Sequence, residues 1–175
     1  YPVNFLLFDY KGEFSDIANS HWLNLFETDR TAILDPIERP LPFTPFKDFT
    51  GKAINEINLY STEMATALCS LDNARISANM SNRLSEAIVE AYKVTNGLPI
   101  TFDLILENYI DRLPNPEKDD SVSSILKQLV RNKLFENEDK MNLIEACFVV
   151  KMDAFPKDGP IAKEIVYFLI SKLNI

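Results

Sequence analysis

The residues best suited to chemistry in this sequence are Asp9, Lys11, Gly12 and Glu13, at and just after the end of an apolar run. That run, Val3–Asp9 (VNFLLFD), is typical of a buried parallel strand that ends at an acidic residue. In open α/β sheets the ligand crevice lies beyond the carboxyl ends of the strands. A carboxylate there can hold a metal-bound water or orient water for attack on a phosphoryl group, and Gly12 permits a sharp turn. An ordinary solvated strand exit is the alternative interpretation of the same residues.

Two arginines form a second candidate set. Arg75 and Arg83 are eight residues apart in a helical pattern, so either could reach a neighbouring subunit. The alternative is a solvated helix face, or pairing within the helix to Asp72 or Glu86.

A small basic patch is predicted further along the chain. Lys127 and Arg131 lie on a later helical pattern, with Lys133 close behind, and could contact DNA. Acidic residues follow directly at Glu136 and Glu138, which weakens that interpretation because they offset the positive charge.

The remaining reactive side chains give little indication of a site. Cys69 and Cys147 lie in apolar patterns and are interpreted as small core residues. With His21 as the single histidine, no metal-ligand cluster is expected. A serine hydrolase would need His21 as its base, but no nucleophile-elbow sequence is present. Trp22 is interpreted as a hydrophobic anchor.

Composition limits the possible classes of protein. The chain has 175 residues, 46% of them hydrophobic, which suits a folded domain rather than a disordered one. Its formal net charge is −8, and acidic residues outnumber basic ones both in residues 1–50 and in the remainder. Such a surface gains little from counterion release, so the chain alone should bind DNA poorly. No apolar run reaches the length of a membrane span, and no secretory signal is visible. A disulfide between the two cysteines is possible but unsupported, and a cytoplasmic location is the simpler interpretation.

The hydrophobic pattern divides the chain into three parts. Residues 1–50 are predicted to hold strands at Val3–Asp9 and Thr31–Leu34, followed by a proline-rich connector. Residues 51–140 are predicted to form four amphipathic helices. Residues 141–175 return to a strand, Glu145–Met152, and a final helix. The predicted fold is a predominantly helical α/β protein, with part of a parallel-sheet core and an inserted four-helix lobe.

Local signals predict several helix ends. Gly97 is available as a left-handed cap after the second helix of the lobe, and Thr101 can cap the third at its N-terminus. Asp158 is predicted to cap the last helix, with Pro160 in its first turn.

Several segments, in order, resemble the HerA/FtsK superfamily of DNA-pumping ATPases. LLFDYKGEFSDI is similar to the strand that follows the phosphate-loop helix, which in that family ends in Asp-x-Lys-Gly-Glu or Asp-Pro-His-Gly-Glu. PLPFTPF resembles the proline-rich exit into an inserted helical region. RLSEAIVEAYKVTNGLPITFDLILENYI and FVVKMDAFPKDGPIAKEIVYFLISKL resemble the segments that follow, up to the Walker B strand. The chain departs from the family at Tyr10, where proline or a small residue is usual.

The resemblance implies a RecA-like core and a place near the nucleotide phosphates for Asp9 and Glu13, with Lys11 and Gly12 in the vicinity. It implies ATP and Mg²⁺ as cofactors, a homo-oligomeric ring, and DNA as a partner of the intact protein.

None of the four glycines belongs to a GxxxxGK[ST] phosphate loop. The chain also begins at Tyr1 and lacks Walker B and arginine-finger segments. We therefore expect a central fragment of such an ATPase, with no cofactor and no activity of its own. DNA processing and antiphage restriction, including phosphorothioation-dependent systems, are the roles that the resemblance suggests.

A second hypothesis comes from a different class of protein. The helical region with its flanking strands could be a non-catalytic module for protein interaction or oligomerisation, which would need no nucleotide. The sequence leaves both hypotheses open, so it does not decide whether the chain belongs to an enzyme.

Overall fold

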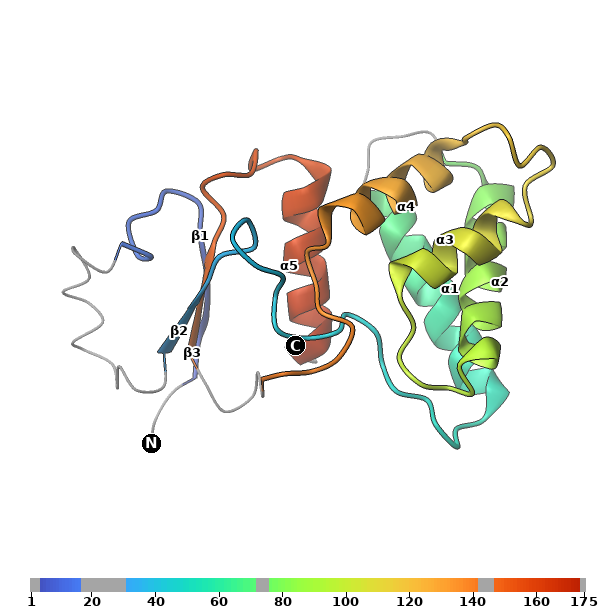
Figure 1. Ribbon diagram of the computed structural model, residues 1–175, viewed down its shortest axis with the longest axis horizontal. Coiled ribbons are helices and arrows are strands. Elements are labelled where there is room, and N and C mark those ends of the chain that lie inside the picture. The colour runs from blue at the N-terminus through green and yellow to red at the C-terminus, as the bar shows by residue number, and fades with distance from the viewer. Residues whose placement is uncertain (1–3, 17–30, 72–75, 142–146, 174–175) are drawn as a thin grey trace. The chain divides into compact units, whose positions relative to one another are not determined.

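The computed structural model describes residues 4–16, 31–71, 76–141 and 147–173. The chain forms two compact units (Figure 1). Unit 1 comprises two separate segments, Tyr1–Pro45 and Leu134–Ile175, and unit 2 comprises Phe46–Lys133.

Unit 1 contains a small parallel sheet. Its strands are β1 (Leu6–Asp9), β2 (Thr31–Leu34) and β3 (Cys147–Lys151), in the order β1-β3-β2. Both outer strands run parallel to β3, with Asp9 opposite Lys151 and Leu34 opposite Val150. This confirms the predicted mixed α/β class with a parallel sheet. Parts of the predicted strands lie outside the described residues, namely Val3, Glu145 and Ala146.

One face of the sheet packs against helix α5 (Pro160–Leu173) (Figure 1). The contact is apolar, because Phe148, Val150 and Met152 of the β3 region form one buried cluster with Ile165 and Leu169 of α5. The alternation of residues along β3 places these three side chains on the same face. Burial of this face holds α5 on the sheet.

The start of α5 differs from the prediction by one residue. The carbonyl of Gly159 accepts the first helical hydrogen bond, from the Lys163 N–H at 3.3 Å, so Gly159 and not Asp158 is the cap. Pro160 occupies the first helical position, where its missing N–H costs nothing and its fixed φ is already helical.

Two segments of unit 1 lead into and out of unit 2, and they are hydrogen-bonded to each other. The Leu41 N–H donates to the Leu134 carbonyl at 2.7 Å, and the Glu136 N–H donates to the Leu41 carbonyl at 3.0 Å. The Lys140 N–H donates to the Pro42 carbonyl at 2.9 Å. Phe43 is fully buried, so the proline-rich segment is part of the core of unit 1.

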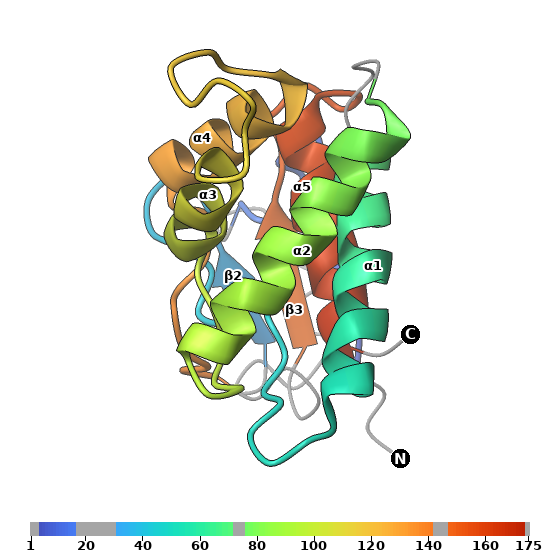
Figure 2. The same cartoon turned by 90° about the vertical axis from the view of Figure 1, so that its right-hand side faces the viewer.

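Unit 2 contains four helices: α1 (Ile54–Leu71), α2 (Ala78–Val94), α3 (Phe102–Ile110) and α4 (Ser121–Asn132). Each packs against the next, and Figure 2 shows α1 and α2 side by side. The interior is built from apolar residues at helical spacing, including Met64, Leu68, Leu84, Ile88, Ile105 and Leu126. No helix in the described ranges is long and apolar enough to cross a bilayer.

The end of α2 corrects one predicted cap and explains a glycine. Asn96, with φ 54°, occupies the left-handed position, and the Gly97 N–H donates to the Tyr92 carbonyl at 2.8 Å. This pattern is a Schellman motif with Asn96, not Gly97, in the left-handed cap position. Gly97 is required for another reason, since a Cβ there would lie 2.7 Å from the Phe49 carbonyl oxygen. The predicted N-cap at Thr101 is confirmed, because its side chain accepts the Leu104 N–H.

Candidate functional site

Asp9, the last residue of β1, organises the loop that follows it. The residue is 2% exposed, and its side chain accepts four hydrogen bonds. The donors are the Phe14 N–H at 2.9 Å, the Ser15 N–H and Oγ at 2.8 Å each, and the Lys11 N–H at 3.3 Å. Burial alone would raise the pKa of Asp9, but the hydrogen bonds from Ser15, Phe14 and Lys11 outweigh it and hold the pKa below 3.8. Asp9 is therefore an ionised acceptor whose oxygens are already used within the loop.

The loop presents its other candidate residues to solvent. Glu13 and Lys11 have side chains that are 63% and 78% exposed, with Oε1 and Nζ 4.0 Å apart. Gly12 adopts φ +73°, and a Cβ there would lie 3.5 Å from Asp153 Oδ2, in the loop after β3. The structure thus brings Asp9, Lys11, Gly12 and Glu13 together, but only Glu13 offers a carboxylate to an approaching ligand.

The neighbouring strand ends carry an ion pair that sequence reasoning missed. Lys151 ends β3, and its Nζ lies 2.7 Å from Oδ2 of Asp35, the residue after β2. Burial alone would raise the pKa of Asp35. The hydrogen bonds from Lys151 and from the N–H groups of Ile37 and Glu38 outweigh burial, so the pKa lies below its ordinary value. The hydrogen bond to Asp35 raises the pKa of Lys151. The charged residues next to the ends of the predicted strands could have indicated such an ion pair. The sequence alone does not give the strand order, so it does not show which of them lie close together.

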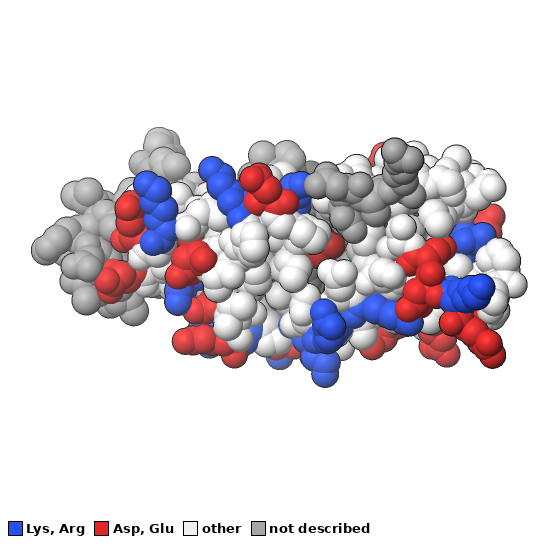
Figure 3. Space-filling model, turned by 90° about the horizontal axis from the view of Figure 1, so that it is seen from above, with Lys and Arg blue, Asp and Glu red and all other residues white. Residues whose placement is uncertain are grey.

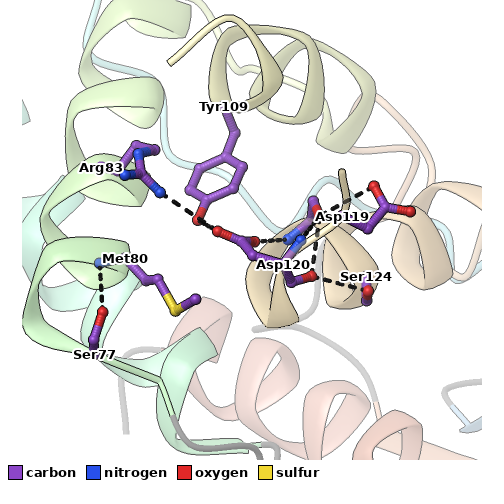
Figure 4. A network of polar contacts seen from close by, with 8 residues as sticks. Ser77, Met80, Arg83, Tyr109, Asp119, Asp120 and Ser124 are labelled. Carbon is purple, nitrogen blue, oxygen red and sulfur yellow. Dashed lines mark hydrogen bonds and ion pairs between the residues drawn. The ribbon is translucent and has the colours of Figure 1, made fainter. Parts of the chain in front are cut away.

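Arg83 is engaged inside unit 2 (Figure 4). Its NH1 lies 3.4 Å from Asp120 Oδ2, and its guanidinium lies 5.8 Å from the centre of the Tyr109 ring. The Tyr109 hydroxyl donates to the same Asp120 oxygen at 2.7 Å. Asp120 also caps α4 by accepting the Ser123 N–H at 2.9 Å. The network therefore links α2, α3 and the start of α4, and the partner of Arg83 is Asp120 and not Glu86. Asp72, the other partner considered, lies outside the described residues.

The other predicted basic residues include Lys127 and Arg131, which lie one turn apart on α4. Lys127 Nζ lies 2.6 Å from Asp119 Oδ1, while Arg131 is exposed near the end of α4. Arg75 lies outside the described residues. On the face drawn in Figure 3, basic side chains are interspersed with acidic ones.

Unit 1 also contains a pocket of about 210 Å³ next to the end of β2. It is lined by Leu34 and Asp35, by the segment 39–42, and by Glu136, Lys140 and Met141. The Glu136 and Lys140 side chains are paired at 2.8 Å.

Among the described residues, no three histidine, cysteine, aspartate or glutamate side chains are grouped so as to hold a metal ion. Comparison with protein-family models, with curated proteins and with solved structures finds no match for this chain.

Proposed function

We propose that this chain forms part of the RecA-like core of a HerA/FtsK-like ATPase that moves or processes DNA, with unit 2 as its inserted helical lobe. The observation that carries the proposal is the exposed Glu13 at the carboxyl end of a parallel sheet, on a loop fixed by Asp9. In the intact protein we expect a homo-oligomeric ring in the cytoplasm that takes part in DNA processing or antiphage restriction.

Three features support this proposal. The candidate residues follow β1, where ligands of open α/β sheets are bound. The order of the described elements agrees with the family resemblance: strand, proline-rich segment, helices, strand, helix. The two segments that flank the helices are hydrogen-bonded to each other at Leu41 and Leu134, as an insertion into one core requires.

The residues present do not by themselves fit ATP or Mg²⁺. The Asp9 carboxylate is buried and accepts four hydrogen bonds from its own loop, which leaves it poorly placed as a metal ligand. No phosphate-binding loop is encoded in the 175 residues. Those parts would come from sequence outside this chain. The role assigned to Asp9 is to position the loop, and the role assigned to Glu13 is to orient the attacking water.

The test is the substitution Glu13→Gln in the intact protein. We expect kcat for ATP hydrolysis to fall by roughly 10²–10⁴-fold, the usual loss for a group that transfers or orients a proton. Stability and nucleotide affinity should remain unchanged, because Glu13 is exposed and its nearest charged partner is Lys11 at 4.0 Å. Glu38→Gln is a matched control, since Glu38 is another exposed glutamate in the loop after β2.

Wild-type turnover in Glu13→Gln would contradict the proposal and favour a non-catalytic interaction module. A complete absence of ATP hydrolysis by the intact protein, with or without DNA, would contradict the proposal more directly.

A further inference from the structure

The pocket in unit 1 has an apolar floor and a charged rim. Leu34 and Leu41 are almost fully buried beneath it, and Pro40, Pro42 and Met141 complete its apolar wall. Its volume is about 210 Å³. An apolar cavity of about 150 Å³ is known to hold a benzene ring. The pocket is therefore large enough for a ring-sized ligand with one polar substituent.

The charges around the rim do not cancel. Asp35 is neutralised by Lys151 at 2.7 Å, and Glu136 is neutralised by Lys140 at 2.8 Å. Arg39 is the remaining charged residue in the lining, and it has no ion pair among the residues that the structure describes. The rim therefore presents one uncompensated guanidinium beside an apolar cavity. The acidic charge elsewhere on the protein is screened over about 8 Å at physiological salt.

We propose that this pocket binds a small carboxylate with an apolar, ring-sized body, held by Arg39. A guanidinium offers a planar fork of donors that matches a carboxylate in two parallel hydrogen bonds. The apolar body covers Leu34 and Leu41 and is shielded from water by the prolines. This site is independent of the loop that carries Glu13, and it needs no nucleotide.

The position of the pocket gives binding a structural consequence. One wall belongs to the segment that enters unit 2, at Arg39–Pro42, and another to the segment that leaves it, at Glu136–Met141. The hydrogen bonds of Leu41 with Leu134 and Glu136 join the same two segments. A ligand that touches both segments stabilises their pairing, so it slows hydrogen exchange at the Leu41 amide.

The test is a titration of the 175-residue protein with sodium benzoate, followed by ¹H–¹⁵N NMR. We expect saturable shifts at the amides of Leu41, Glu136 and Lys140, with a dissociation constant on the order of 1 mM for so small a ligand. Benzamide has nearly the same shape but no charge, and should bind roughly tenfold more weakly. Arg39→Gln should weaken benzoate to the level of benzamide, whereas Arg131→Gln, at an exposed arginine of unit 2, should change nothing.

Three results would overturn the proposal: no saturable shift at those amides, equal affinity for benzoate and benzamide, or unchanged affinity in Arg39→Gln. Arg39 is exposed, so this variant is expected to fold, and an unchanged spectrum elsewhere will verify that. None of these results depends on ATP hydrolysis, so they are separate from the test at Glu13.

Discussion

Asp9 in unit 1 and Asp120 in unit 2 each accept several hydrogen bonds, but the donors come from different places. The donors to Asp9 in unit 1 all lie within six residues along the chain. Asp120 in unit 2 accepts from Ser123 nearby, but also from Tyr109 and from Arg83, which is 37 residues away. The first aspartate shapes a loop, whereas the second joins three helices.

The left-handed glycines show the same contrast. At Gly12 in unit 1, an added Cβ would make only ordinary contact with the Asp153 side chain, at 3.5 Å. At Gly97 in unit 2, it would collide with the backbone of Phe49, at 2.7 Å. Gly12 serves the local shape of a turn, and Gly97 allows two distant segments to approach.

This difference indicates which parts of the protein open together and which can open alone. Contacts that link distant segments make a unit open as a whole, whereas local contacts allow one loop to open alone at lower cost. The loop with Lys11 and Glu13 is of the second kind. A loop that must adapt to a ligand is expected to belong to this less stable class.

The largest effect is expected for Gly97→Ala. The new Cβ would meet the Phe49 backbone, and alanine is also disfavoured at φ +86°. Overpacking and the left-handed conformation together should cost about 4 kcal/mol. Urea unfolding monitored by circular dichroism would measure it. Gly51→Ala is the matched control, since Gly51 has φ +73° but no atom within 4 Å of the added Cβ. Similar losses in both variants would show that the close approach is unimportant.

A somewhat smaller loss is expected for Asp120→Ala. The substitution removes the cap of α4 and leaves the buried Tyr109 hydroxyl and the Arg83 guanidinium without their acceptor. Together these should cost about 3 kcal/mol in urea unfolding. Asp119→Ala, at the adjacent exposed residue paired with Lys127, should change the unfolding midpoint far less. Equal effects of the two substitutions would argue against a network that joins the helices.

Asp9→Ala should have a smaller and more local effect. It leaves the N–H groups of Phe14 and Ser15 without their acceptor, at a cost of about 2 kcal/mol. Hydrogen exchange should accelerate at the amides of Phe14 and Ser15 but not in unit 2. Faster exchange throughout α1 to α4 would contradict the view that Asp9 acts locally.

The sequence predicted the elements well and the contacts between them poorly. Helical spacing gave the four helices of unit 2, and Thr101 was correctly identified as a cap, because both signals depend on neighbours in the chain. The Schellman motif placed Asn96 in the position predicted for Gly97, since either residue tolerates a left-handed φ. Only the approach of Phe49 explains why glycine follows.

The candidate site shows the same limit. The grouping of Asp9, Lys11, Gly12 and Glu13 followed from one strand end, so it was visible in the sequence. The pairing of Lys151 with Asp35 joins residues 116 positions apart and depends on β3 lying in the middle of the sheet. The partner of Arg83 was missed because Asp120 belongs to another helix.

The smallest expected effect is a pH dependence that separates the charge of Asp9 from its shape. The pKa of Asp9 is lower in the folded protein than its ordinary value of 3.8, because the hydrogen bonds from Ser15, Phe14 and Lys11 outweigh burial. A carboxylate of this kind contributes stability above its unfolded pKa, and the contribution is lost as the pH falls through the folded value.

We therefore compare wild type with Asp9→Asn, which keeps the shape of the side chain but not its charge. The difference in their free energies of unfolding should be constant between about pH 5 and pH 7 and should shrink as the pH falls below about 4. Asp35 also has a lowered pKa, so the wild-type curve alone cannot isolate Asp9, but the difference between the two proteins can. A difference that stays constant down to about pH 2.5 would mean that the amide fails for geometric reasons, and that the ionised form of Asp9 is not what fixes the loop.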